Sequence, residues 1–225
     1  MKLAIILITS GREDCTEKTL DSFFRMNGTC DIAPFEVKLY HGDDMSKTER
    51  NRVLARTHGF DSILQTTSRH GAHGMRQRML LGVVKRCDPT HIMVLENDWE
   101  SVQPMPWRAI QEAFAFDTTY AFRMYGEQKQ LDGTRPAGPF HAGRDLADPK
   151  WANVLYGSTE CEIGSIHWGA PPCVVSTREL LYLHSGTTRD KQSMVKSGKI
   201  DKMTVRVKRN VFYHIGYERT PDFRG

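Results

Sequence analysis

Short apolar runs separated by polar turns predict strands in the first hundred residues. Residues 3–8 and 91–95 are continuous apolar runs, which are typical of strands buried on both faces of a sheet. Residues 35–40 alternate between apolar and polar positions and predict another strand, and residues 60–64 predict a short one. Each of these runs is followed by a polar cluster, so the chemistry-bearing residues are expected at strand ends.

Helical spacing fills the stretches between these strands. Helices are predicted over residues 13–26, over residues 48–58 and from about residue 75 to residue 86, where apolar side chains recur every three or four positions. Alternation of strands and helices predicts an α/β fold with a mostly parallel, Rossmann-like sheet flanked by helices. Ligands of such sheets bind at the carboxyl ends of the strands.

The second half of the chain has a different pattern. A helix is predicted after Pro106, another follows the capping box Ser176-Thr-Arg-Glu179, and a third spans residues 188–197. The remaining predictions are a long loop over residues 128–151 and strands over residues 119–125, 164–175, 203–207 and 210–213. We expect one domain over residues 1–225, with a first half of residues 1–103 and a smaller C-terminal part of residues 104–225.

Composition narrows the class of protein without defining its function. The chain has 225 residues, of which 39% are hydrophobic and 26% charged, so collagen-like, disordered and disulfide-scaffold classes are excluded. The first apolar run is far shorter than the roughly 20 residues of a membrane span and has no signal-peptide cleavage pattern. Five scattered cysteines without a CxxC pair predict reduced thiols, and we expect a cytoplasmic protein without a membrane partner.

Glu96-Asn97-Asp98 gives the sharpest chemical signal in the sequence. Two carboxylates stand two residues apart, directly after a buried strand. Mg²⁺ binds through one or two carboxylates together with substrate phosphates, so this arrangement suits a metal–diphosphate site. The alternative is a solvated acidic turn.

Three further clusters follow strands or precede helices. Thr9-Ser10-Gly11-Arg12 is a short polar loop through which backbone N–H groups could approach an anion, although it is no Rossmann or P-loop motif. Asp44 could accept hydrogen bonds from a nucleobase or ribose, or could be an ordinary turn residue. The segment of residues 69–76 combines glycines, histidines and arginines that could line a phosphate-bearing ligand.

The remaining candidates lie in the second half. His214, after the last predicted strand, could complete a metal shell or could be a structural histidine. A zinc site is not expected, because neither HExxH nor a Cys/His quartet occurs. Glu160, Glu162 and Asp190 are possible general bases, although Asp190 could equally cap a helix.

Taken together, these residues resemble glycosyltransferases of the GT-A fold, in particular small phage and bacterial members related to the large inverting family. The loop of residues 9–12 resembles the family's first nucleotide-contacting loop. Residues 94–98 resemble the strand that carries its D-x-D metal motif, with Glu96 in place of the first aspartate. Trp168-Gly-Ala-Pro-Pro172 resembles its acceptor-side region.

The resemblance implies a GT-A-like domain in which residues 1–103 bind a nucleoside-diphosphate sugar and residues 104–225 bind the acceptor. It implies Mn²⁺ or Mg²⁺ held by Asp98, Glu96 and His214. Asp190 would take the proton from the acceptor hydroxyl, with Glu160 and Glu162 in reserve, and Trp168 and Lys191 would contact the acceptor. The implied donor-binding residues are Thr9, Ser10, Gly11, Arg12, Asp44, Arg69, His70, Arg76 and Asn97.

The acceptor is the open question of the sequence. The net charge is only +4, but basic residues are dense over residues 191–209 and recur in the first half. They could hold polynucleotide phosphates, and some small phage members of the family modify hydroxymethylated pyrimidines in DNA. A glycan or lipid-linked acceptor, a nucleotidyltransferase, and a non-catalytic nucleic-acid-binding module stay open as alternatives.

Overall fold

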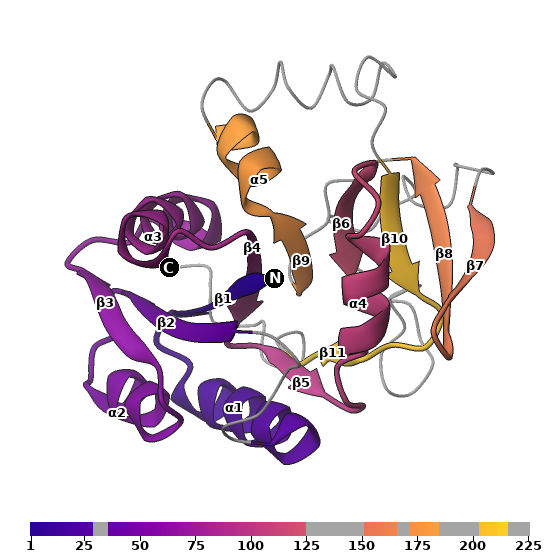
Figure 1. The fold of residues 1–225 in the computed structure, drawn as a ribbon. Coiled ribbons are helices and arrows are strands. Elements are labelled where there is room, and N and C mark those ends of the chain that lie inside the picture. Colours follow the sequence, from indigo (N-terminus) through magenta and orange to yellow (C-terminus); the bar gives the residue numbers. More distant parts are fainter. Residues whose placement is uncertain (29–35, 125–150, 166–171, 185–202, 216–225) are drawn as a thin grey trace.

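Nine strands form one large sheet in a computed structural model that describes residues 1–28, 36–124, 151–165, 172–184 and 203–215 (Figure 1). Their order across the sheet is β3-β2-β1-β4-β9-β6-β10-β8-β7. These strands are β1 (Lys2–Thr9), β2 (Glu36–Asp44), β3 (Asp61–Thr66), β4 (His91–Glu96), β6 (Thr119–Arg123), β7 (Ala152–Tyr156), β8 (Thr159–Ser165), β9 (Cys173–Ser176) and β10 (Met203–Val207). Only β9 and β8 run antiparallel to both neighbours, so seven of the nine strands share one direction. The mostly parallel α/β sheet predicted from the sequence is confirmed.

Helices cover both faces of this sheet, and each face has its own apolar core. The helices are α1 (Glu13–Asn27), α2 (Arg50–Thr57), α3 (Gly71–Cys87), α4 (Trp107–Ala113) and α5 (Thr177–His184). Side chains of α1, α2 and α4, such as Phe23 and Ile110, share one core cluster with Ile5 and Leu7 of β1. Side chains of α3 and α5, including Met79, fill the other cluster against the opposite face of β1. Figure 1 shows α1 and α2 on one side of β1 and β2, and α3 on the other.

The elements of the first half agree with their predictions apart from their ends. The second strand extends to Asp44, and α3 begins at Gly71, so both reach further into the polar clusters than the apolar pattern indicates. The extended part of β2 packs closely against α3, as shown by Gly42, where an added Cβ atom would lie 2.5 Å from the Sδ atom of Met79. The polar clusters therefore start inside regular elements and are positioned by them.

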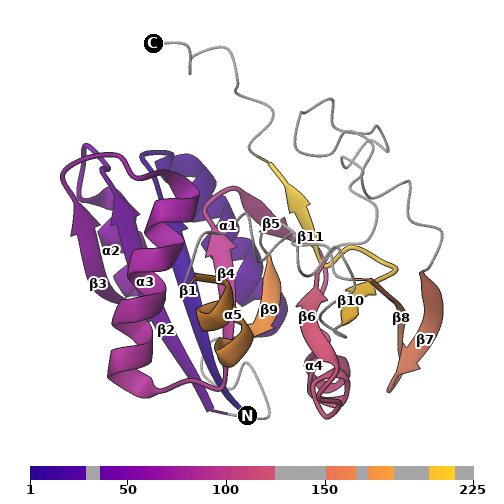
Figure 2. The same cartoon turned by 90° about the horizontal axis from the view of Figure 1, so that it is seen from above.

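The second half differs more from its prediction. In place of one strand over residues 164–175, the structure has β8 ending at Ser165 and β9 beginning at Cys173, while β7 was not predicted. The short strands β5 (Trp99–Ser101) and β11 (Phe212–His214) pair as a separate sheet between the two halves of the large one (Figures 1 and 2). The predicted helix over residues 188–197 and nearly all of the predicted loop lie outside the described residues. None of the described helices is long and apolar enough to cross a bilayer.

Candidate functional site

The predicted polar clusters of the first half meet at the carboxyl edge of the parallel strands. Thr9 at the end of β1 is the register partner of Asp43 on β2, and Ile8 is the partner of Glu96 on β4. This edge is where open α/β sheets bind their ligands. The sheet therefore brings together the loop of residues 9–12, the acidic end of β2 and the Glu96-Asn97-Asp98 segment.

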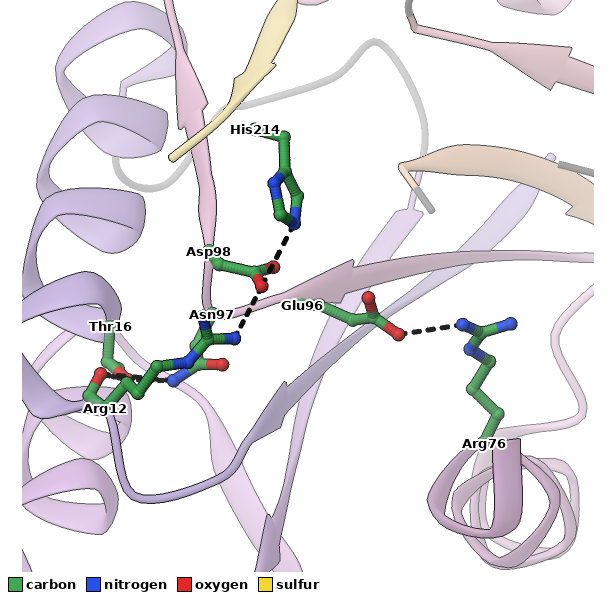
Figure 3. Close-up of polar contacts among 7 residues, drawn as sticks. All are labelled: Arg12, Thr16, Arg76, Glu96, Asn97, Asp98 and His214. Atoms are coloured by element: carbon green, nitrogen blue, oxygen red, sulfur yellow. Dashed lines mark hydrogen bonds and ion pairs between the residues drawn. The ribbon is translucent and has the colours of Figure 1, made fainter. Parts of the chain in front are cut away.

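Asp98 lies between a guanidinium and an imidazole (Figure 3). Its Oδ2 atom is 2.5 Å from Nη2 of Arg12 and 3.1 Å from Nε2 of His214. His214 reaches this position because β11 pairs with β5, where His214 lies opposite Trp99, and because the N–H of Ile215 donates to the Asp98 carbonyl at 2.8 Å. A residue more than a hundred positions away thus completes the cluster that follows β4.

The Asp98 carboxylate is held in its charged form. Burial alone would raise its pKa, but the hydrogen bond and charge of His214, together with the Arg12 guanidinium, hold the pKa below its ordinary value. The Oδ1 atom is buried and has no hydrogen-bond partner among the described residues. A buried anionic oxygen without a partner is a feature that a cation ligand would satisfy.

Glu96 points away from Asp98 and forms a second ion pair. Its Oε1 atom lies 2.8 Å from Nη2 of Arg76 on α3. Burial raises the pKa of Glu96, and the Arg76 charge only partly offsets this effect. Cys173 at the start of β9 is close enough to feel both charges, but burial raises the pKa of its thiol to about 11. This thiol is therefore not suited to act as a nucleophile at neutral pH.

Asn97 fastens the start of α1 to the end of β4. Its Nδ2 donates to the Arg12 carbonyl at 3.1 Å and to Thr16 Oγ1 at 3.0 Å, and its backbone N–H donates to the Ile8 carbonyl. The side-chain amide therefore fixes the backbone from which Arg12 extends. The resemblance implies that Asn97 binds the donor, and this stays a prediction. The structure shows the positioning contact, which no local sequence pattern indicates.

A buried network stiffens the loop of residues 9–12. Thr9 Oγ1 donates to Asp43 Oδ1 at 2.9 Å and also lies 2.9 Å from Nε2 of His41. Ser46 donates to the same Asp43 oxygen and accepts the N–H of Gly11 at 3.0 Å. Gly11 has a φ of 71°, which favours glycine. Thr9 thus shapes the loop from inside, while Ser10 is half-buried and Arg12 reaches the site.

The burial of His41 in this network is expected to make the stability of the fold depend on pH. Burial, aided by the charges of Arg52 and Arg56, lowers its pKa to about 4 from 6.5. Between these two pH values, His41 is protonated in the unfolded chain but neutral in the folded chain. The neutral His41 therefore contributes about 3 kcal/mol to the free energy of unfolding above pH 6.5, and this contribution is lost as the pH falls to 4.

The measurement is urea unfolding of the wild type and His41→Gln from pH 7 to pH 4. The free energy of unfolding of the wild type should fall more steeply with acidification than that of the variant. His91, whose pKa is also lowered to about 4 by burial, keeps its share of the slope in both proteins. Parallel pH profiles would contradict the role given to His41.

Asp44 is engaged by the start of α3. Its Oδ1 accepts the Thr66 hydroxyl at 3.0 Å and the N–H of His70 at 2.9 Å, and its Oδ2 accepts the N–H of Gly71 at 2.8 Å. Such a carboxylate satisfies the free N–H groups of a helix N-terminus. Asp44 therefore positions the His70–Gly71 turn, and a nucleobase contact by Asp44 stays a prediction. Arg69 is exposed beside this turn.

Replacing Asp44 with asparagine is expected to destabilise the fold. The new NH₂ group would face backbone or hydroxyl donors, which leaves at least one buried donor unsatisfied and costs about 1–3 kcal/mol. Urea unfolding at pH 7 measures this loss, with Asp61→Asn on the exposed side of β3 as a control that changes the same charge. Equal stabilities of the two variants would contradict the capping role.

The candidate bases of the second half are divided between described and undescribed residues. Glu162 on β8 forms an ion pair with Arg206 at 2.7 Å, and the Arg206 guanidinium stacks on the Trp151 ring at 4.1 Å. Glu160 is exposed near the start of β8. β8 stands four positions from β4, which is roughly 19 Å at about 4.8 Å a strand. Asp190, Trp168 and Lys191 lie outside the described residues.

The cluster fits a divalent cation as a partly completed shell. Among the described residues, no group of three or more His, Cys, Asp or Glu side chains converges as a metal site. Asp98 and His214 offer one carboxylate and one imidazole, and the buried Oδ1 of Asp98 is free of protein partners within the described part of the chain. Mg²⁺ and similar ions take one or two protein carboxylates and complete the shell with substrate phosphates and water. The residues present are compatible with that arrangement.

Solved structures share this fold at low sequence identity. The first 349 residues of S. aureus TarS match 97% of this chain and 61% of their own length, with a TM-score of 0.60 and 13% identity. The same protein in complex with UDP-GlcNAc matches 95% of this chain and 58% of its own, with a TM-score of 0.57 and 14% identity. A mycobacterial protein matches 95% and 67%, with a TM-score of 0.57 and 13% identity.

The sequence comparisons add no closer relative. No family model matches the sequence, and no curated protein matches it. The chain spans about 60% of the TarS fragment that it matches. The structural likeness nevertheless covers almost the whole chain. The chain therefore has the fold of GT-A-type glycosyltransferases, as its sequence predicted.

Proposed function

We propose that this protein is a glycosyltransferase that moves a sugar from a nucleoside-diphosphate sugar to an acceptor hydroxyl, with the help of a divalent cation. One observation carries the proposal. At the carboxyl edge of a GT-A-type sheet, the charged carboxylate of Asp98 lies between Arg12 and His214 and retains a buried oxygen without a partner among the described residues. The cationic groups there suit the phosphates of a sugar diphosphate, and the carboxylate suits the divalent cation that accompanies it.

Each side chain has a role in this proposal. Asp98 and His214 would hold the cation, which when bound neutralises the charge that develops on the departing diphosphate. Arg76, held by Glu96 on the far side of the cluster, presents its guanidinium toward the same edge. Glu96 would then orient Arg76, or would join the cation shell as the resemblance implies. Asn97 keeps the Arg12 backbone in place.

The choice of base rests on this structure, and the choice of donor rests on a solved structure with the same fold. We retain Asp190 as the base that takes the acceptor proton in an inverting transfer, because Glu162 is engaged by Arg206 and β8 stands far from β4 in the sheet order. TarS, which shares the fold, has been solved with UDP-GlcNAc. A uridine-diphosphate sugar is therefore the first donor to test.

An anionic acceptor is supported by the distribution of charge. Residues 47–87 contain nine Lys or Arg and two Asp or Glu, which leaves 22 basic and 25 acidic residues elsewhere. Seven of the nine are exposed, and they divide between the α2 side of the sheet (Lys47, Arg50 and Arg56) and the α3 side (Arg69, Arg78, Lys85 and Arg86). We propose DNA with hydroxymethylated pyrimidines as the acceptor. A mass shift after incubation with such DNA and a sugar nucleotide would support this, and transfer only to glycans or lipid-linked sugars would refute it.

The experiment for the reaction itself is a thermal-shift panel followed by product analysis. Nucleoside diphosphates, triphosphates and sugar nucleotides are tested with and without Mn²⁺. A rise in melting temperature with a nucleoside diphosphate plus Mn²⁺, and release of that diphosphate from its sugar, are the expected results. Stabilisation by triphosphates with pyrophosphate release would indicate a nucleotidyltransferase instead. Salt-sensitive DNA binding without any nucleotide effect would indicate a binding module.

A further inference from the structure

Arg12 already pairs with one oxygen of the carboxylate that the proposed cation needs. We propose that Arg12 is an internal counter-ion of Asp98 that competes with the divalent cation, so that the cation binds tightly only after the donor diphosphate has drawn Arg12 away. This inference rests on the proposed function and adds a coupling between its two ligands. It concerns the order and linkage of binding, which neither the fold nor the resemblance specifies.

The competition follows from the geometry around Asp98. Nη2 of Arg12 is 2.5 Å from Oδ2, and His214 shares that same oxygen at 3.1 Å. A cation bound to Asp98 and His214 would lie close to the guanidinium. Like charges in close proximity repel strongly where water is scarce, and the Asp98 side chain is only 9% exposed. The guanidinium and the cation therefore cannot both occupy this carboxylate at low cost.

Arg12 can leave Asp98 without disturbing the backbone. Its carbonyl accepts the Asn97 amide at 3.1 Å and both the N–H and the hydroxyl of Thr16 at 3.0 Å. These three bonds fix the origin of the side chain at the start of α1. The side chain itself is 25% exposed. The long, flexible arginine can thus turn toward an anion at the same edge.

The second ion pair does not have this property. Arg76 holds Glu96, whose carboxylate extends toward α3 and away from Arg12 (Figure 3). Removing Arg76 would therefore leave the Asp98–His214 pair as it is. Arg12, in contrast, neutralises the same carboxylate oxygen that the imidazole contacts.

A linkage between the two ligands follows. When a diphosphate attracts Arg12, the guanidinium leaves Asp98 and the affinity of Asp98 for the cation rises. By reciprocity, the cation raises the affinity for the diphosphate by the same factor. Without Arg12, Asp98 is available from the start. Cation affinity in the absence of nucleotide should then rise, and the factor by which nucleotide improves it should shrink.

The test measures Mn²⁺ binding by calorimetry and by the electron paramagnetic resonance signal of free Mn²⁺, first alone and then with UDP. Arg12→Gln is expected to bind Mn²⁺ alone about tenfold more tightly than the wild type, within the usual range of coupling factors. In the wild type, UDP should tighten Mn²⁺ binding by a similar factor, which the variant largely loses. Arg108→Gln, which removes an exposed arginine paired with Glu112 at 2.9 Å, is the matched control and should behave as the wild type.

The outcomes separate this inference from the proposed function. If Arg12→Gln binds Mn²⁺ alone no more tightly than the wild type while UDP still stabilises both, the competition is refuted and the glycosyltransferase proposal stands. If no protein binds Mn²⁺ or UDP, both proposals fall. Should Arg12→Gln fold poorly, Arg12→Lys and Arg12→Met form a second pair, in which only the neutral side chain is expected to tighten Mn²⁺ binding.

Discussion

Replacing Asp98 with asparagine is expected to abolish sugar transfer, with a loss of turnover of about 10³-fold or more. Asparagine keeps the shape of the side chain but removes the charge that Arg12 and His214 contact. In the proposed reaction this charge holds the cation opposite the departing diphosphate. Losing a single preorganised electrostatic contact of this kind commonly costs about 10²–10³ in rate, and losing a metal ligand costs the cation as well.

The control is Glu100→Gln, which neutralises the next carboxylate along the chain outside the cluster. Both variants should melt cooperatively and give wild-type circular dichroism spectra, because Arg12 is partly exposed and can find water when Asp98 is neutral. Initial rates of donor turnover at saturating Mn²⁺ then separate the two. Turnover near the wild-type rate in Asp98→Asn would refute the assignment of Asp98.

The first half of the fold could be predicted because its signals are local. An apolar run of six residues is typical of a buried strand, and β1 is indeed buried along almost its whole length. The same run ends where the polar loop begins, so the position of the loop at the sheet edge follows from the pattern. The acidic segment after β4 was found in the same way.

The missing elements lack such signals. β7 packs at the outer edge of the sheet and exposes most of its residues, so no apolar alternation distinguishes it from a loop. β5 has only three residues, too few for an apolar pattern to predict it, whereas β11, also three residues long, overlaps the strand predicted over residues 210–213. Their pairing depends on tertiary contacts alone.

The partners within the site were also beyond prediction. Arg12 and Asp98 are separated by 86 residues, and Asp44 and Gly71 by 27. Composition and spacing indicate that arginines and carboxylates are present at strand ends, but which guanidinium meets which carboxylate depends on the strand order. For this reason the sequence suggested only ligand contacts for Asp44 and Asn97. In the structure, Asp44 contacts the start of α3 and Asn97 contacts the start of α1.

The strand that carries His214, β11, includes a buried aromatic side chain that anchors it to α1. Phe212 is completely buried, and its ring stacks on Phe23 of α1 at a centroid distance of 6.3 Å. Two residues later the same strand presents His214 to Asp98. Because β11 has only three residues, its position depends on the packing of Phe212 together with the ladder to β5 and the flanking bonds from Val211 N–H to the Met124 carbonyl and from Ile215 N–H to the Asp98 carbonyl.

Phe212→Ala is accordingly expected to lose about 3–5 kcal/mol of unfolding free energy and to lower the melting temperature by roughly 10 °C, since the truncation leaves a cavity that the core cannot fill. Phe122→Ala on β6 removes the same side chain from another fully buried position and should cost a similar amount. The two should differ in activity. At a temperature where both are folded, Phe212→Ala should transfer sugar as poorly as His214→Ala, because β11 no longer holds the imidazole against Asp98, whereas Phe122→Ala should retain most of its rate. Equal activities of the two phenylalanine variants would show that β11 positions nothing that the reaction needs.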